Sequence, residues 1–395
     1  MDRSALEALL SPDGTRLVEE LGQIASTADA ASAITRLRRA GHAPEAVAAV
    51  VEQARLRERA RAKFGDDASR MLFTRAGLEQ ATRLTVALRH AERLSAAGLR
   101  RVADLGCGIG GDALGFATCG LDVLAVDADE VTAAIAAHNL ADFGDRVAVR
   151  HARAEDVDLA GVEAVWLDPA RRTAGHSETA RVRAADYSPP LPWAFALASR
   201  LPAGIKLGPG FDRTRIPDGV EAQWIGVGGA TVELVLWSGA LARPGVGRAA
   251  LLVRGEVAHE LTAATDTADE PVRALGAYVH EPAGAVIRAR LIGEVARRIG
   301  AGMLAPNIAY LTSDAPAETP FVSTFRVREQ LPNDIGRLSR ALRERGIGTL
   351  EIKKRGVDVD PAVLRPRLKL RGPESATLIL TRVGERRLTL LVERV

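Results

Sequence analysis

Two aspartates and a run of glycines stand at spacings that suit the binding of a nucleoside. Asp104 lies within the short run Arg101–Leu105, which is expected to form a buried strand. In the turn that follows, every second residue is a glycine: Gly106, Gly108 and Gly110. Such glycines let the backbone approach a ligand closely, and a helix beginning at about Gly111 offers free N–H groups to an anion. A second apolar run, Val123–Val126, ends at Asp127, whose carboxylate can accept two hydrogen bonds from a ribose diol. The pattern predicts a strand, a glycine turn, a helix and a second strand that ends in an acid.

A second group of chemically capable residues follows the apolar run Ala164–Leu167. It comprises an acid, a proline, an alanine and two arginines: Asp168, Pro169, Ala170, Arg171 and Arg172. An Asp-Pro pair is also an ordinary strand-ending turn. The glycine turn upstream favours a functional role for this pair over a purely structural turn. The guanidinium plane of an arginine can stack on a base or bind a phosphate.

The glycine spacing, with an acid before it and an acid after the next strand, resembles motif I of class I S-adenosylmethionine-dependent methyltransferases. The resemblance implies that Asp104 meets the methionine amino group and that Asp127 holds the ribose. The cofactor-binding residues implied are the following: Asp104, Gly106, Cys107, Gly108, Gly110, Asp127, Ala128, Glu155 and Asp156. Two alternatives stay open, a nicotinamide dehydrogenase and a strand–helix unit that binds no ligand.

The adenine-binding acid of this family commonly follows the third strand, and here the pattern departs. His151 is followed by Arg153 at the position expected for the acid, and Glu155 and Asp156 come two and three residues later. The resemblance therefore implies that either of these two acids receives the adenine amine.

The residues after the fourth strand resemble the Asp/Asn-Pro-Pro-aromatic motif of methyltransferases that modify exocyclic amines. The resemblance implies that Asp168 and the carbonyl of Pro169 accept hydrogens from the target nitrogen and aim its lone pair at the methyl group. Ala170 replaces the second proline and Arg171 replaces the aromatic residue. The catalytic assignment is thus Asp168, Pro169 and Arg171, with the identity of the target atom left open. A dehydrogenase would not explain this motif.

Alternating apolar strands and helices must position these residues. The expected strands are 101–105, 123–126, 147–151, 164–167, 204–207, 223–226 and 232–237. The last two follow each other closely through Gly228-Gly229, as in a hairpin. The prediction is an α/β fold with a seven-stranded doubly wound, Rossmann-like sheet. Aromatic residues in its later loops could stack a substrate base: Tyr187, Trp193 and Phe211.

The first 97 residues are predicted to be helical. A helix over Glu45–Lys63 ends in a basic stretch, which favours a solvated face over a nucleic-acid contact. A loop follows, and then a helix from Gly77 to about Ala97. By resemblance to methyltransferases, Phe73 and Thr74 in this loop would cover the cofactor.

The C-terminal part changes pattern and is predicted to be α+β. Tyr278–Pro282 and Tyr310–Asp314 resemble a small ferredoxin-like domain, and Thr349–Gly356 and Leu370–Gly372 resemble the THUMP-like domain attached to bacterial class I methyltransferases. True THUMP domains deliver RNA to a modifying active site, and the likeness implies that role. The elements expected here are helices over 285–298 and 334–345 and strands over 307–312, 321–330, 350–354, 376–382 and 387–392. The predicted domains are a helical region 1–97, a methyltransferase domain 98–245, a ferredoxin-like connecting domain 246–320 and a THUMP-like domain 321–395.

The distribution of charge agrees with an anionic partner for the last domain. The whole chain carries a net charge of +3. Residues 331–395 hold 15 Lys and Arg against 8 Asp and Glu, an excess of seven, so the remainder carries −4. The candidate phosphate contacts are Lys353, Lys354 and Arg355, with a second row of Arg367, Lys369 and Arg371 if that segment is extended. A soluble arginine-rich face is the alternative explanation.

Composition narrows the remaining possibilities. Two cysteines, Cys107 and Cys119, are too few for a disulfide framework or a zinc site, so no metal is expected. No signal peptide and no membrane span are expected, which predicts a cytoplasmic location. We therefore expect an S-adenosylmethionine-dependent methyltransferase that modifies a base in RNA. The alternatives are a small-molecule methyltransferase and a non-catalytic RNA-binding protein.

Overall fold

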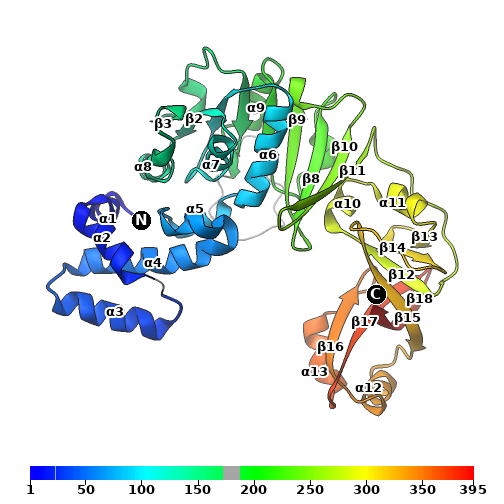
Figure 1. Cartoon of the computed structure of the whole chain (residues 1–395). Coiled ribbons are helices and arrows are strands. Elements are labelled where there is room, and N and C mark those ends of the chain that lie inside the picture. The colour runs from blue at the N-terminus through cyan, green and yellow to red at the C-terminus, as the bar shows by residue number, and fades with distance from the viewer. Residues whose placement is uncertain (23, 172–186) are drawn as a thin grey trace. The chain divides into compact units, whose positions relative to one another are not determined.

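The computed structural model describes residues 1–22, 24–171 and 187–395 (Figure 1). These residues divide into two compact units. The first comprises Met1–Leu207, Phe211–Val220 and Val235–Arg243, and the second comprises Gly208–Gly210, Glu221–Leu234 and Pro244–Val395. Within the described residues, no helix combines the length and the apolar character that crossing a bilayer requires.

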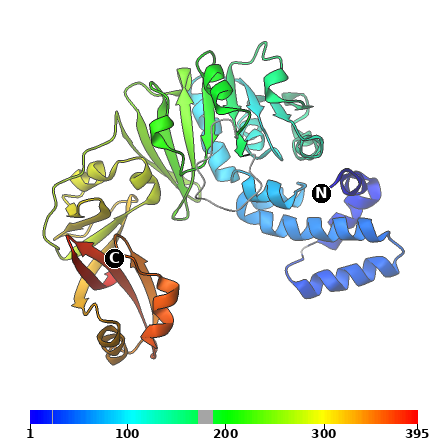
Figure 2. The ribbon, with the colours of Figure 1, turned by 180° about the vertical axis from the view of Figure 1, so that it is seen from behind.

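Helices open the first unit, as predicted: α1 (Arg3–Leu10), α2 (Pro12–Leu21), α3 (Thr27–Arg39) and α4 (Pro44–Phe64). The side chains of Asp2, Ser11 and Ser26 begin the first three of these helices by accepting a hydrogen bond from a backbone N–H of the first turn. The first three helices pack on α4 (Figures 1 and 2), where Leu9, Leu37 and other apolar side chains form a buried cluster.

The segment between α4 and the first strand holds η1 (Gly65–Ser69), α5 (Arg75–Gln80) and α6 (Leu84–Ala96). The prediction of one helix from Gly77 to about Ala97 is wrong, because the backbone is extended at Ala81 and Arg83. The cause lies in α4. Lys63 Nζ donates hydrogen bonds of 2.7 Å to the carbonyl oxygens of Leu78, Glu79 and Ala81, which end α5.

Parallel strands form the centre of the first unit: β1 (Arg101–Leu105), β2 (Asp122–Asp127), β3 (Val147–His151), β4 (Ala164–Leu167) and β7 (Ala203–Leu207). Their order is β7-β4-β1-β2-β3, and β9 (Ala230–Ser238) adjoins β7. The order reverses between β1 and β4, which is where ligands bind in doubly wound sheets. The strands are connected by α7 (Gly111–Thr118), α8 (Glu130–Asn139), η2 (Ala141–Arg146), η3 (Ala154–Asp156) and α9 (Leu191–Ala198).

The first strands of the second unit include a tight hairpin. β8 (Glu221–Val227) is joined to β9 by Gly228 and Gly229, whose φ angles of 58° and 86° suit a two-residue turn. The predicted hairpin is thereby confirmed. β10 (Arg248–Arg254) pairs in parallel with β8, and β11 (Val257–Ala263) pairs antiparallel with β10. These two strands add to the seven that the sequence predicted.

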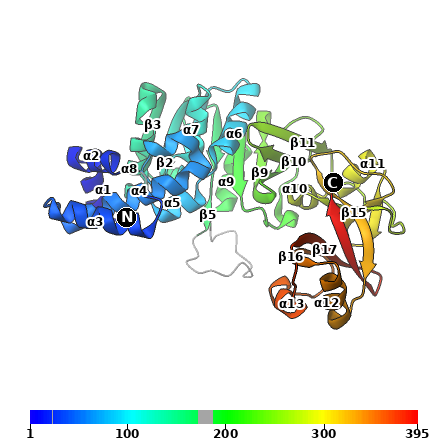
Figure 3. The same cartoon turned by 60° about the horizontal axis from the view of Figure 1, so that its bottom comes forward.

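The rest of the second unit is built on a sheet in the order β13-β14-β12-β15-β18-β17-β16. Its strands are β12 (Tyr278–Pro282), β13 (Gly302–Ala305), β14 (Ile308–Ser313), β15 (Val322–Leu331), β16 (Ile347–Lys354), β17 (Glu374–Val383) and β18 (Arg386–Arg394). One buried cluster joins Val279 and Tyr310 to Phe325 and Leu390. Helices α12 (Ile335–Glu344) and α13 (Pro361–Leu368) pack on each other and on β16 (Figure 3).

Two predictions in this unit are wrong. The long helix over 285–298 is divided into α10 (Gly284–Arg288) and α11 (Ile292–Arg298), because Arg290 adopts a left-handed φ of 59°. The segment Arg367–Arg371 is not extended, because α13 runs to Leu368 and Lys369 follows it with a φ of 47°. The one-sided row of Arg367, Lys369 and Arg371 is therefore not formed.

Candidate active site

The glycine turn joins β1 to α7 in a conformation that suits glycine. Gly106, Gly108 and Gly110 have φ angles of 99°, 56° and 88°. The N–H groups of Gly106 and Cys107 both donate to the carbonyl of Val126 at 2.9 Å, which ties the turn to β2. A Cβ atom at position 106 would lie only 3.0 Å from the carbonyl oxygen of Asp168. The turn thus brings the ends of β1 and β4 into close contact.

Asp127 lies at the end of β2, beside the glycine turn. Its carboxylate accepts hydrogen bonds from the N–H of Gly108 at 3.0 Å and of Asp129 at 2.9 Å. Burial raises the pKa of Asp127, and these two hydrogen bonds act in the opposite direction. Ala128 follows, and its carbonyl accepts a 3.2 Å hydrogen bond from His151 Nε2. The predicted ribose acid therefore also supports the turn in which the cofactor would lie.

Asp104 is a buried carboxyl group at the end of β1, with only 1% of its surface exposed. Neither of its carboxyl oxygens has a hydrogen-bond partner among the residues that the structure describes. Burial and the neighbouring Asp112 and Asp168 raise its pKa well above the ordinary value, and Lys206 offsets this in part. A buried acceptor without a donor is costly, and a ligand ammonium group would supply both donor and charge.

Asp112, on α7, is equally buried but has several partners. It accepts a 2.7 Å hydrogen bond from Thr82 Oγ1, lies 2.9 Å from His90 Nδ1 and lies 3.6 Å from Lys206 Nζ. Burial alone would raise its pKa, but Lys206 and His90 lower it to about 2. Asp112 is therefore held in place by its partners, whereas Asp104 has none among the described residues.

Lys206 connects this cluster to Asp168. Its Nζ donates to Asp168 Oδ2 at 2.6 Å and to Thr82 Oγ1 at 2.8 Å. Sequence analysis did not assign a role to Lys206, Thr82, His90 or Asp112. One signal was available, since a lysine in an otherwise apolar strand of a buried parallel sheet requires a partner.

The catalytic motif continues from Asp168 into a short ribbon. Pro169 is buried, and β5 (Ala170–Arg171) pairs antiparallel with β6 (Tyr187–Ser188), which sets the backbone of Arg171 opposite Tyr187. Arg172, the last residue of the motif, lies outside the described residues.

The other predicted site residues have varied surroundings. Glu155 and Asp156 lie in η3, where Arg153 is 3.1 Å from Glu155 and 4.0 Å from Asp156. Cys107 is buried, which raises the pKa of its thiol. Among the candidate aromatic residues, Tyr187 and Phe211 are buried and Trp193 is partly exposed.

The predicted lid segment packs beside the glycine turn. Phe73 is fully buried against Phe64, and Thr74 begins α5 by accepting a hydrogen bond from Gly77. Asn139 bonds to Leu72 and to the carbonyl of Ile109 in the turn. The ring of Phe73 therefore belongs to the core, while its backbone segment lies near the turn.

Comparison with known proteins supplies the family. A family model described as THUMP domain-like matches residues 322–394, and one described as a domain of unknown function matches residues 2–60. A Mycobacterium tuberculosis (strain CDC 1551 / Oshkosh) protein named as an uncharacterized S-adenosylmethionine-dependent methyltransferase is 35% identical over 353 residues. The match covers 85% of this chain and 92% of the relative. A relative from strain ATCC 25618 / H37Rv matches to the same extent.

A solved structure supports the same fold. The crystal structure of a protein from Porphyromonas gingivalis W83, described as a methyltransferase, superposes with a TM-score of 0.71 at 24% identity. The likeness covers 99% of this chain and 96% of that chain.

The residues present suit the cofactor of this family, S-adenosylmethionine. Asp104 offers a buried acceptor that would suit the amino group of its methionine part, and Asp127 is an acceptor beside a turn that permits close approach. From this site and from an identity of 35% over most of both chains, it follows that the chain belongs to the S-adenosylmethionine-dependent methyltransferases.

Proposed function

We propose that this methyltransferase modifies a nitrogen of a base in RNA, and that the C-terminal domain holds the RNA during the reaction. The observation that carries the RNA substrate is an exposed basic surface within the region similar to THUMP domains. A nitrogen is favoured by the resemblance of Asp168 and Pro169 to the motif of amine-modifying methyltransferases, and the backbone of Asp168 lies against the glycine turn.

The basic surface lies on α12, α13 and the loop that follows. Its members are exposed cations: Arg337, Arg340, Arg365, Arg367, Lys369 and Arg371. Among the described residues, none of them has an acidic side chain within salt-bridge distance. Ser339 Oγ donates to the carbonyl of Leu368 at 2.6 Å, which holds the two helices together. Cations arranged in this way suit contacts with the phosphates of a nucleic acid.

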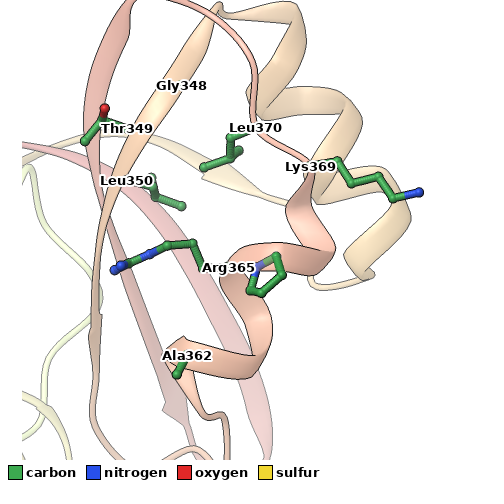
Figure 4. Close-up of a pocket in the computed structure, with 8 residues that line it drawn as sticks. Gly348, Thr349, Leu350, Ala362, Arg365, Lys369 and Leu370 are labelled. Carbon is green, nitrogen blue, oxygen red and sulfur yellow. The ribbon is translucent and has the colours of Figure 1, made fainter.

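A groove between α13 and β16 forms part of this surface (Figure 4). The side chain of Arg365 extends from α13 toward the strand with Thr349 and Leu350, whereas that of Lys369, which follows the helix, points in the opposite direction (Figure 4). No acidic residue is among the described residues that line the groove. We infer that a phosphate of the RNA backbone binds beside Arg365.

The cations that the sequence favoured are arranged differently. Lys353 Nζ lies 2.8 Å from Glu281, and Arg355 lies 3.4 Å from the same carboxylate. Lys354, which stands between them in the sequence, is exposed. Because Glu281 already partners Lys353 and Arg355, the surface on α12 and α13 is the stronger candidate for phosphate contact.

In the reaction, S-adenosylmethionine supplies a methyl group already activated by the sulfonium. The protein then has to position donor and acceptor in line. In this proposal Asp104 holds the amino group of the cofactor, Asp127 holds the ribose, and Glu155 or Asp156 receives the adenine amine. Asp168 and the carbonyl of Pro169 accept hydrogens from the target nitrogen and so direct its lone pair. Arg171 stacks on the base or contacts a phosphate.

The proposal is tested by mass spectrometry of nucleosides from total RNA, taken from cells with and without the gene. One methylated nucleoside should disappear with the gene. The wild-type gene should restore it, whereas Asp168→Ala should not. An identical set of modified nucleosides in all strains would exclude RNA as the substrate.

A further inference from the structure

We propose that Lys206 is a positioning residue that fixes the carboxylate of Asp168 for methyl transfer. This inference rests on the proposed function, in which Asp168 orients the target nitrogen. Nothing in the glycine motif or in the Asp-Pro motif points to this lysine, and it comes from a strand that begins 35 residues after Asp168.

The pair follows from the register of the sheet. In the parallel pair of β4 and β7, Leu167 lies opposite Ile205, so the next residues, Asp168 and Lys206, emerge side by side. Lys206 Nζ donates to Asp168 Oδ2 at 2.6 Å. The lysine side chain is 12% exposed and the aspartate side chain is 35% exposed. The ammonium group is therefore largely shielded, while the carboxylate remains partly accessible to a substrate.

Lys206 is itself held in place by a second hydrogen bond. A second donor of its ammonium group reaches Thr82 Oγ1 at 2.8 Å, and Thr82 donates to the ionised Asp112. His90 lies 2.9 Å from Asp112 and stacks near Trp166, with ring centroids 4.3 Å apart. The chain of contacts from His90 to Asp168 thus rests on a packed aromatic core and gives the lysine little freedom.

Stability alone does not explain this arrangement. Removing charges from water is expensive, and a buried ion pair is often no more stabilising than apolar residues of similar size. An ammonium group fixed beside Asp168 does something that an apolar residue cannot. It keeps the carboxylate ionised, and hence an acceptor only, and it fixes the direction of one oxygen.

Cofactor analogues test the proposal without any substrate. Sinefungin carries an amine where S-adenosylmethionine carries the transferred methyl group, and S-adenosylhomocysteine carries nothing there. In the wild type, an accepting Asp168 should favour sinefungin. Lys206→Met should reduce that preference by about tenfold, the effect of one lost hydrogen bond to a charged group. Lys206→Arg should restore part of it. Isothermal calorimetry measures both dissociation constants.

Two roles of Lys206, orienting the Asp168 carboxylate and neutralising its charge, predict opposite results. If Lys206 merely neutralised Asp168, its removal would strengthen sinefungin binding, so an increased or unchanged preference in Lys206→Met overturns the proposal. Lys353→Met is the matched control, because Lys353 is also a partly buried lysine beside a carboxylate, that of Glu281 at 2.8 Å, but lies in the second unit. It should lower the melting temperature without changing the preference.

Methyl transfer to RNA from cells lacking the gene provides a second measurement. Lys206→Met should lower kcat by about 100-fold, as expected for a misplaced catalytic group, and leave KM for the cofactor nearly constant. The acidic limb of the pH–rate profile should move to higher pH, because a carboxylate without the neighbouring positive charge of Lys206 protonates more readily. If the wild type does not methylate RNA, the proposed function fails, and the analogue preference still decides the role of Lys206.

Discussion

Two charged regions of this molecule use charge in opposite ways. At the ends of β1, β4 and β7, the charged groups are buried, close together and mostly paired with one another. On α12 and α13 they are exposed, and among the described residues they have no acidic partners. Buried pairs fix geometry and are barely screened by salt, whereas exposed cations act together as a field that salt weakens. Single substitutions should therefore be severe in the first region and mild in the second.

The largest effect is expected at Asp168. Asp168→Ala removes the acceptor that we propose orients the nucleophile, so kcat should fall by at least about 100-fold, within the usual range for a group that receives a proton or a hydrogen bond in the transition state. Asp168→Asn should be milder, because an amide oxygen still accepts a hydrogen bond. Single-turnover transfer of labelled methyl to RNA measures both, with cofactor affinity as the control. If both variants react at the wild-type rate, Asp168 has no catalytic role and only forms the turn at the end of β4.

Asp127 comes next, because it is proposed to hold the ribose of the cofactor and it also supports the turn. Asp127→Ala should weaken S-adenosylmethionine binding at least about tenfold, since a hydrogen bond to a charged group contributes about 1.5–3 kcal/mol. Nicotinamide nucleotides should not bind to either protein. The two backbone hydrogen bonds from Gly108 and Asp129 would be lost as well, so Asp127→Asn, which keeps an acceptor, is the control. Unchanged affinity in folded Asp127→Ala would remove this residue from the site.

Asp104 should make cofactor binding depend on pH. Its pKa is raised in the free protein, and a bound ammonium group would lower it, so binding should release a proton. Affinity should then increase as pH rises above the ordinary carboxyl value of 3.8, by at most about tenfold per pH unit, and level off above the raised pKa. Asp112 stays ionised in this window, because its pKa is about 2.

Calorimetry of S-adenosylhomocysteine in two buffers with different ionisation enthalpies counts the released protons. Asp104→Asn should bind more weakly and lose most of the pH dependence, and any remaining slope reports on Asp127, whose pKa is also raised. An equal slope in wild type and variant would show that Asp104 is not the titrating group.

The smallest effect per residue is expected on the basic surface. Replacing Arg365 and Lys369 by Ala should weaken RNA binding evenly across sequences. It should also reduce the salt dependence by about 0.7 log units per lost contact per tenfold change in salt for single strands. The matched control replaces Lys353 and Arg355, which removes the same charge from a cluster already paired with Glu281. Fluorescence anisotropy over a salt series compares the two. Equal slopes for both pairs would mean that net charge alone matters.

Local signals made the central fold predictable. The predicted bounds of β1, β3 and β4 agree with the structure. Each strand contains consecutive apolar residues and is followed by a glycine turn or by a turn with charged residues. The residue pattern also predicted the glycine turn and the acid at the end of the next strand, although not the hydrogen bond between them. Each of these features depends on only a few neighbouring residues.

Contacts between distant residues could not be predicted in the same way. The end of α5 depends on Lys63, which lies in another helix. The pairing of Asp168 with Lys206 depends on the register of β4 and β7. The error at Arg367–Arg371 has a different origin. Asp360 caps α13 and Pro361 occupies its first turn, so a helix start signal was present and was not used.

The shared core of the second unit has a consequence for how this part of the chain unfolds. β15 pairs with β12 on one side and with β18 on the other, and Val279 and Tyr310 lie in the same buried cluster as Phe325 and Leu390. A chain ending near Ser313 would therefore expose the apolar faces of β12 and β14 to water. Residues 278–313 and 322–394 should lose structure in a single cooperative step and resist proteolysis together. The contribution of the THUMP-like region is therefore better measured by surface substitutions in the intact chain than by truncation.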